Sequence, residues 1–310
     1  MKKIIIIVLI FIMSGCSKQE PPQEPTYFLF ASPLTNHPLW LQAKSGMEAA
    51  CKDFKIQCDW KGPARISISA MQDAIYTGLM KQADGIITQG VIHPSLIESG
   101  TKKGIPFVLV DSPLQGANPL ATITKDFDEQ AELLLNDIEH KMGATTFLKI
   151  GFQVSDLSFD LAQKQMDAIR KVFKTHEGGF EVVSISESKS DIIRSKNEWA
   201  KIFREQTDMN LAINLAGENA IGCVEAKEYT KNQADIQIYG VDNMYDTIAL
   251  IKKGKIAGSV VTSFYDYGYE SIKILYEKVK EHKEPTKKLI PAKLVLVDKS
   301  NIDTYEKEFK

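Results

Sequence analysis

Short apolar runs rich in β-branched residues alternate with longer amphipathic stretches along the chain from residue 27 onward. Apolar runs of this length, bounded by glycine, proline or polar residues, predict buried strands. The longer stretches repeat apolar residues every three or four positions, which predicts helices that cover a sheet. The expected strands are Tyr27–Ala31, Ile56–Trp60, Gly85–Thr88, Phe107–Val110, Ala121–Thr124, Phe147–Phe152, Phe180–Ile185, Leu211–Leu215, Ile236–Val241, Ala257–Val261 and Leu289–Val297.

The alternation of strands and helices predicts an α/β fold with parallel sheets covered on both faces. Residues 27–124 and 147–261 each hold five strand–helix units, so the chain contains a coarse internal repeat. Gly104 and Gly254 predict helix ends before two of the strands. We therefore expect two doubly wound, Rossmann-like lobes with a cleft between them. In the first expected helix, one apolar stripe is formed by Trp40, Ala43, Met47, Ala50, Cys51 and Phe54.

The N-terminal segment has a different composition. Lys2 and Lys3 precede an uncharged apolar run from Ile4 to Met13, and Ser14-Gly15-Cys16 follows. This order is typical of an export signal, and the run is about half the ~20 residues that a membrane-spanning helix needs. Small residues directly before a cysteine resemble the bacterial lipobox, whose thiol is acylated; the alternative is an ordinary cleaved signal in which Cys16 has no special role. We expect a signal peptide over 1–15 and a proline-rich, lipid-anchored tether over 16–26.

Length and charge limit the classes of function. About 295 residues remain after a leader of 15, which is enough for two lobes of roughly 150 residues each. Loss of Lys2 and Lys3 lowers the number of basic residues from 38 to 36 against 40 acidic ones, so the net charge becomes about −4. Because the chain also has no dense block of lysine or arginine, this balance argues against a nucleic-acid-binding surface.

Three cysteines follow Cys16, and their spacing matches no metal-binding pattern. Cys51 and Cys58 could form a disulfide with each other. We expect instead that they are two small, buried, free thiols on a helix and the next strand.

Six short motifs are spread along the chain. They are Asn36-His37-Pro38-Leu39-Trp40, Ala83-Asp84-Gly85-Ile86-Ile87, Gly104-Ile105-Pro106-Phe107-Val108-Leu109-Val110-Asp111-Ser112, Tyr239-Gly240-Val241-Asp242, Gly268-Tyr269 and Asn301-Ile302. In this order and spacing they resemble the type 1 periplasmic-binding proteins of the ribose and galactose group. The resemblance covers nearly all of the chain after the tether, and it implies a protein that binds a small solute between two lobes.

In the group that this chain resembles, three segments connect the lobes and form a hinge. The resemblance places these segments near Thr124–Asp128, Val261–Phe264 and Lys283–Lys288. The first ligand-binding lobe is then expected over 27–126 and 264–285, and the second over 127–263 and 286–310.

Ligand-binding side chains are expected at strand ends, because the loops that leave the carboxyl ends of parallel strands meet at one crevice. A polyhydroxy ligand needs carboxylates that accept its hydroxyl protons, groups that donate hydrogen bonds in return, and an aromatic face. The candidates are His37, Trp40, Gln89, Asp111, Asp156, Asp160, Glu218, Asn219, Asp242 and Thr262. The resemblance supports Asp111 and Asp242 in particular.

Several candidates also have a structural explanation. Trp40 fits the apolar stripe of its helix, and His37 suits a loop or a helix N-cap. Asp111 could cap a turn, Asp242 could cap the next helix, and Asp160 could add negative charge to a first helical turn.

The chain departs from ribose-type proteins within the expected site. Residues 155–160 contain no arginine where those proteins have one, Glu218-Asn219 stands in place of their Asn-Asp, and Thr262 in place of their glutamine or asparagine. The expected site thus lacks a guanidinium but keeps its carboxylates. This balance favours a neutral or cationic ligand and makes ribose itself a poor candidate.

Common enzyme signatures are absent from the sequence, which has no G-x-G-x-x-G turn after an early strand, no P-loop, no G-x-S-x-G and no H-E-x-x-H. The five histidines are scattered, so we expect no metal site, no cofactor and no catalysis. The resemblance implies a monomeric lipoprotein on the extracytoplasmic face of the cell membrane that captures a sugar-like molecule for an ABC importer. The alternative is a sensing module that presents its liganded form to a membrane histidine kinase or chemoreceptor.

Overall fold

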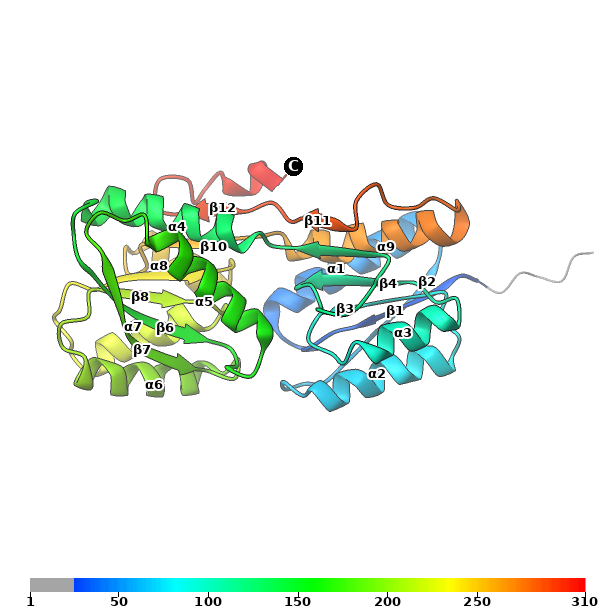
Figure 1. The fold of residues 1–310 in the computed structure, drawn as a ribbon, viewed down its shortest axis with the longest axis horizontal. Coiled ribbons are helices and arrows are strands. Elements are labelled where there is room, and N and C mark those ends of the chain that lie inside the picture. Colours follow the sequence, from blue (N-terminus) through cyan, green and yellow to red (C-terminus); the bar gives the residue numbers. More distant parts are fainter. Residues whose placement is uncertain (1–24, 310) are drawn as a thin grey trace, which may run out of the picture.

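The computed structural model describes residues 25–309, which form two α/β lobes side by side (Figure 1). The predicted signal over 1–15, the lipobox-like Cys16 and most of the predicted tether lie outside the described residues. The tether is predicted to reach residue 26, but Thr26 is buried and its carbonyl oxygen accepts a hydrogen bond from the Gln57 backbone N–H. Among residues 25–309, no helix is long and apolar enough to cross a membrane.

The first lobe contains β1 (Tyr27–Ala31), α1 (Pro38–Phe54), β2 (Gln57–Lys61), α2 (Ile68–Met80), β3 (Gly85–Gln89), α3 (Ser95–Lys102), β4 (Phe107–Asp111), β5 (Ala121–Thr124), α9 (Phe264–Lys280) and β11 (Leu289–Pro291). Its sheet is parallel and has the strand order β2-β1-β3-β4-β5-β11. Successive side chains of a strand point to opposite faces, so Phe28 and Phe30 pack under α1 and α9 while Leu29 and Ala31 pack under α2 and α3. Both faces of the sheet are therefore covered.

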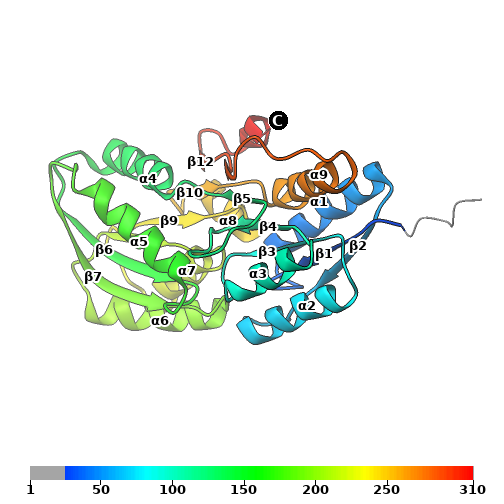
Figure 2. The same cartoon turned by 45° about the vertical axis from the view of Figure 1, so that its right-hand side comes forward.

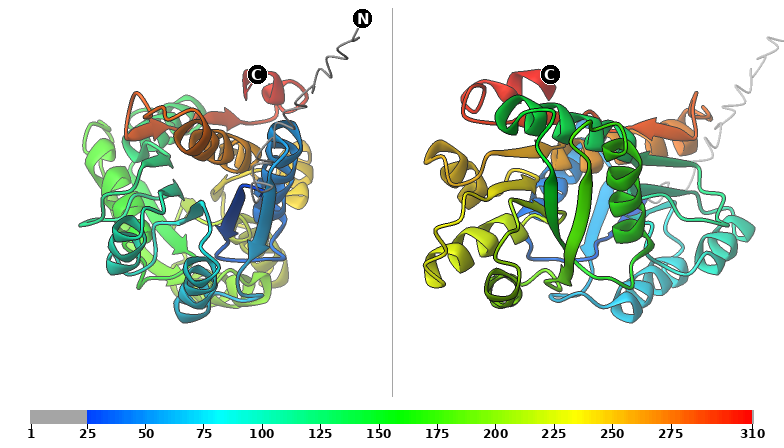
Figure 3. Two further views of the ribbon diagram at one scale, coloured as in Figure 1. Left: turned by 90° about the vertical axis from the view of Figure 1, so that its right-hand side faces the viewer. Right: turned by 60° about the vertical axis from the view of Figure 1, so that its left-hand side comes forward.

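The second lobe contains α4 (Phe127–Met142), β6 (Leu148–Val154), α5 (Asp160–Phe173), β7 (Phe180–Glu187), α6 (Ile192–Glu205), β8 (Leu211–Asn214), α7 (Asn219–Tyr229), β9 (Gln237–Val241), α8 (Tyr245–Lys252), β10 (Gly258–Val261) and β12 (Val295–Val297), followed by the 3-10 helix η1 (Tyr305–Phe309). Its sheet has the order β7-β6-β8-β9-β10-β12, and only β12 runs antiparallel to its neighbour. Helices α4 and α5 pack on Ile150 and Phe152, and α6 to α8 pack on the opposite face around Trp199. Figure 3 shows helices on both sides of the strands.

The two sheets repeat one strand order, because the second strand of each lobe lies at the edge and the first lies between the second and the third. This confirms the predicted fold of two doubly wound lobes. In such a sheet the helical connections on the two sides of the first strand lie on opposite faces, which opens a crevice at the carboxyl ends of the strands. Each lobe therefore presents a potential binding edge.

The sequence predicts one strand over Leu289–Val297, and this prediction is wrong. The run holds two strands in different sheets, because β11 pairs with β5 in the first lobe and β12 pairs with β10 in the second. The third connection between the sheets is therefore 292–294, whereas it was expected near Lys283–Lys288. Residues 289–291 were expected in the second lobe, but they pair within the first sheet. The two halves differ in burial, since Leu289 and Pro291 are exposed whereas Val295 and Val297 are buried, but an apolar pattern alone does not show which sheet each half joins.

The expectation that Cys51 and Cys58 are free thiols is also wrong, because the structure joins them in a disulfide with a Cα–Cα distance of 6.3 Å. Helix α1 ends at Phe54, and Lys55 then adopts a left-handed conformation with φ of 55°. This residue reverses the chain, so β2 returns beside the last turn of α1 and brings Cys58 next to Cys51. The remaining cysteine of the described chain, Cys223, is buried and free.

Helices α1 and α9 come from opposite ends of the chain and lie side by side (Figure 2). Two glycines allow their close approach. A Cβ atom at Gly46 would lie 2.0 Å from the Tyr265 carbonyl oxygen, and one at Gly268 would lie 1.9 Å from the Ala43 carbonyl oxygen. Any larger residue at either position would force the two backbones apart.

Candidate functional site

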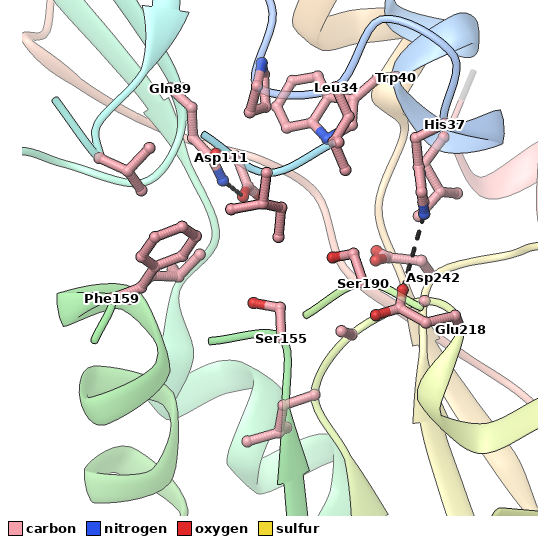
Figure 4. Close-up of a pocket in the computed structure, with 18 of the residues that line it drawn as sticks. Leu34, His37, Trp40, Gln89, Asp111, Ser155, Phe159, Ser190, Glu218 and Asp242 are labelled. Carbon is pink, nitrogen blue, oxygen red and sulfur yellow. Dashed lines mark hydrogen bonds and ion pairs between the residues drawn. The ribbon is translucent and has the colours of Figure 1, made fainter. Parts of the chain in front are cut away.

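Carboxyl ends of strands from both sheets surround a cavity between the lobes (Figure 4). The cavity measures about 90 Å³, which is room for several water molecules or one small ligand. Its polar lining residues are His37, Ser67, Gln89, Asp111, Lys125, Ser155, Gln165, Ser190, Glu218 and Asp242. Its apolar lining includes Leu34, Trp40, Ile66, Met71, Phe159 and Phe264.

Asp111 and Asp242 occupy equivalent places in the two lobes. Asp111 is the last residue of β4 and Asp242 directly follows β9, and these are the fourth strands of their lobes in sequence order. Both residues have a left-handed backbone, with φ of 68° and 66° respectively. This conformation is uncommon outside glycine, and such residues cluster at functional sites. The repeat therefore places two unusual carboxylates on opposite sides of one cavity.

A lysine lies between these two carboxylates. The Lys125 Nζ is 3.4 Å from the Asp111 Oδ1 and 3.2 Å from the Asp242 Oδ1, and all three side chains are less than one-tenth exposed. The ammonium also lies 5.4 Å from the ring centroid of Phe264, within the range of a cation–π contact. Lys125 belongs to the short segment between β5 and α4, where the chain first passes from one lobe to the other.

Burial and the neighbouring charges shift the pKa values of Lys125 and Asp242. Burial alone would lower the pKa of Lys125, but the charges of Asp242 and Asp111 outweigh burial and raise that pKa above its ordinary value. Burial raises the pKa of Asp242, an effect that the positive charge of Lys125 opposes. Burial and the nearby carboxylates raise the pKa of Tyr267, so its hydroxyl stays protonated and donates to the Asp111 Oδ1 at 3.5 Å.

Asp111 has a further donor in Gln89, whose Nε2 lies 2.7 Å from the Asp111 Oδ2 (Figure 4). Across the cavity, the His37 Nε2 of the first lobe lies 3.7 Å from the Glu218 Oε2 of the second, and Ser188 donates a hydrogen bond to the other Glu218 oxygen at 2.8 Å. His37 is the N-cap residue of α1, but its side chain makes no capping hydrogen bond, and its Nδ1 is buried without a partner among the described residues. The imidazole is therefore directed to the lobe interface rather than to its own helix.

The apolar walls come from both lobes. Trp40 is 6% exposed and belongs to the core around α1, yet one part of it lines the cavity. Its ring meets Phe264 edge-on at 5.3 Å, while Phe159 closes the cavity from the second lobe (Figure 4). Aromatic faces beside charged hydrogen-bonding groups suit a ligand with both C–H and O–H surface.

Six of the ten candidates line this cavity and four do not. His37, Trp40, Gln89, Asp111, Glu218 and Asp242 line it. Asp156 instead pairs with Lys189 at 2.7 Å at the wider mouth of the cleft, and Asp160 forms an exposed i,i+4 pair with Lys164. Thr262 donates to the Lys293 carbonyl oxygen at 3.0 Å and lies by the connecting segments. Asn219 is fully buried at the start of α7 and is not part of the cavity lining.

Lys125 was not among the predicted site residues, and its ammonium supplies a positive charge to a site that was expected to lack a guanidinium. A signal was available, because Lys125 directly follows an expected strand end, as Asp111 and Asp242 do. The partners of Lys125 lie 14 residues before it and 117 after it, so its charged contacts could not be read from local spacing. Phe159 and Phe264 were not predicted as site residues either, although each is the first aromatic residue after its strand, β6 and β10 respectively.

Two doubly wound lobes around a cavity at their strand ends define a two-lobed binding protein. The chain belongs to a family of this class, because residues 28–284 match the family model described as periplasmic binding protein domain. The family binds solutes and is extracytoplasmic. No curated protein matches the sequence.

Solved structures with the same fold are similar over nearly their whole length. GanP, a glucose-galactose binding protein from Geobacillus stearothermophilus, is 21% identical, with a TM-score of 0.83 and coverage of 90% of this chain and 99% of its own. An ABC transporter solute-binding protein from Agrobacterium vitis with bound D-fucose is 19% identical, with a TM-score of 0.83 and coverage of 91% and 99%. A structure described as the XylFII–LytSN complex is 19% identical, with a TM-score of 0.81 and coverage of 90% and 99%.

Proposed function

We propose that this protein captures a small sugar or sugar-like molecule outside the cytoplasm and delivers it to an ABC importer, without chemical change to the ligand. The observation that carries this proposal is the convergence of hydrogen-bonding groups and aromatic side chains from both lobes on one small cavity. Charged hydrogen bonds contribute ~1.5–3 kcal/mol each, enough for a few of them to select a polar ligand. Solved neighbours described as sugar-binding proteins support the same class of ligand.

Titration calorimetry with D-glucose, D-galactose, D-fucose and arabinose tests this proposal. For a sugar that binds, Asp242→Ala should weaken affinity by roughly 10- to 150-fold, because it removes a charged hydrogen bond. Asp128→Ala is the matched control, since this carboxylate is paired with Lys171 on the surface of the second lobe. Absence of binding by every sugar contradicts the ligand class, and unchanged affinity in Asp242→Ala contradicts the site.

The disulfide supports an extracytoplasmic location, because such bonds persist in oxidising compartments and are rare in the cytosol. We propose that Cys16 carries the lipid that holds the protein at the membrane, on the evidence of the lipobox-like Met13-Ser14-Gly15-Cys16. Labelling of cells with a radioactive fatty acid tests this, and Cys16→Ser should lose the label. A wild-type protein without label contradicts the anchor.

We further propose that the protein is a monomer. We also propose that its lobes are 27–126 with 264–291 and 127–263 with 292–309, since β11 pairs in the first sheet.

A second candidate function is presentation of the liganded form to a membrane sensor kinase. It is favoured by the similarity to the protein of the XylFII–LytSN complex. Deletion of a permease or of a sensor kinase encoded beside this gene would separate the two functions.

A further inference from the structure

The ion pairs of Lys125 span the two lobes. Asp111 belongs to the first lobe, Asp242 to the second, and Lys125 to the segment that connects them. A bound ligand that touches both lobes selects a closed arrangement, because it adds contacts that an open arrangement lacks. Lys125 likewise contacts both lobes, because its ammonium pairs with a carboxylate of each.

Most of the hydrogen-bonding capacity of Asp111 is already occupied. Its Oδ2 accepts from Gln89, and its Oδ1 accepts from Tyr267 and faces Lys125. A carboxylate has about four acceptor positions, so little remains for a ligand. Asp242 receives the Lys125 ammonium at Oδ1 only, which leaves its Oδ2 as the better acceptor.

The position of Lys125 also determines which charge a ligand can carry. The formal charges that line the cavity are those of Asp111, Glu218 and Asp242 against one ammonium, with His37 beside Glu218. This excess of negative charge disfavours an anionic ligand. A cationic ligand would bind best between Asp111 and Asp242, but the Lys125 ammonium already occupies that place.

We propose that Lys125 replaces the cationic group of a ligand inside the protein: it binds the carboxylates of both lobes, holds the lobes together without ligand, and reserves the remaining cavity for an uncharged polyhydroxy molecule. This inference rests on the proposed sugar-binding function for its ligand class but not for its bridge between lobes. Loss of the ammonium leaves two buried carboxylates that repel each other, and the lobes can separate to hydrate them.

The distance between the lobes tests the bridge without any ligand. Spin labels at Tyr76→Cys on α2 and Ile193→Cys on α6 report on the edge away from the connecting segments (Figure 1). The native cysteines of the described chain do not interfere, because Cys51 and Cys58 are bonded and Cys223 is buried. Double electron–electron resonance should give one short distance for the unliganded wild type and a longer, broader distribution for Lys125→Met.

Lys171→Met is the matched control, because Lys171 pairs with Asp128 on the surface, and its distances should equal those of the wild type. If Lys125→Met alone does not fold, the triple substitution Asp111→Asn, Lys125→Met, Asp242→Asn removes the bridge without leaving buried charge, and it should also lengthen the distance. Distances in both Lys125 variants equal to those of the wild type overturn the bridge.

The ligand class is tested with D-galactose and D-galactosamine as probes. The wild type should bind galactose at least tenfold more tightly, and Lys125→Met should reduce that ratio at least tenfold because galactosamine gains the vacated place. A wild type that prefers galactosamine overturns the role of Lys125 in selecting the ligand. If neither probe nor any other sugar binds, the proposed sugar-binding function fails, while the label distances still decide whether Lys125 joins the lobes.

Discussion

Reduction of the Cys51–Cys58 disulfide should destabilise the protein measurably. The bond closes a short loop, with a sequence separation of 7, and loop-closure entropy for such a loop gives about 2.5 kcal/mol at 25 °C. Cys51 is a buried residue in the last turn of α1, so the bond also attaches the edge strand β2 to the end of that helix. With this loss of free energy, the unfolding temperature should fall by about 5–10 °C.

Thermal unfolding followed by circular dichroism, with and without a reducing agent, measures this effect. The double substitution Cys51→Ala, Cys58→Ala is the control, because the reducing agent should not change its unfolding temperature. Thiol titration of the denatured wild type should find two more thiols after reduction. An unfolding temperature that does not respond to reduction, in a protein that gains those two thiols, would refute the reasoning from loop closure.

Three further changes probe other parts of the fold. Gly268→Ala should destabilise the first lobe by about 1–3 kcal/mol or more, because the new Cβ would lie 1.9 Å from the Ala43 carbonyl oxygen; urea unfolding measures this. Asp191→Ala should cost about 1 kcal/mol in the same assay, because it removes the N-cap of α6. Burial alone would raise the pKa of Asp156, but hydrogen bonds led by that from Lys189 outweigh it and lower the pKa. A carboxyl group whose pKa is lowered in the folded state stabilises the fold at pH values above its ordinary pKa of ~4, and this stability is lost as the pH falls through the folded-state pKa. The stability of the wild type should therefore drop below about pH 4, and that of Asp156→Asn should drop less steeply.

The sequence is sufficient to predict the architecture because the inner strands of both lobes are short, apolar and largely buried. Ten of the eleven expected strands overlap a single observed strand, and two of them, Tyr27–Ala31 and Ala121–Thr124, have the observed bounds. Burial on both faces makes such runs continuous rather than alternating, which separates them clearly from the helices. The eleventh, Leu289–Val297, fails because pairing partners, and not local composition, decide which sheet a strand joins.

Site residues could be predicted by the rule that a carboxylate or amide side chain that follows an expected strand binds the ligand. Gln89, Asp111 and Asp242 follow directly from that rule, and all three line the cavity. Asp160 obeys the same rule but points to solvent and pairs with Lys164, because the first turn of α5 has an exposed side that the sequence pattern does not specify. Lys125 needed the three-dimensional arrangement, since its charge is tolerated only between two carboxylates that come from different lobes.

The contact of α1 with α9 has a consequence for the order in which the chain folds. The five parallel strands of the second lobe lie in one uninterrupted stretch that is complete at Val261. One face of the first-lobe sheet is covered only in part, by α1, until α9 at residues 264–280 packs beside Gly46 and its neighbours. Contacts between residues far apart in sequence form late, because a long loop must first be closed. We therefore expect the C-terminal half of the molecule to acquire its structure first, and the N-terminal lobe to remain open to chaperones and proteases until nearly the entire polypeptide is available.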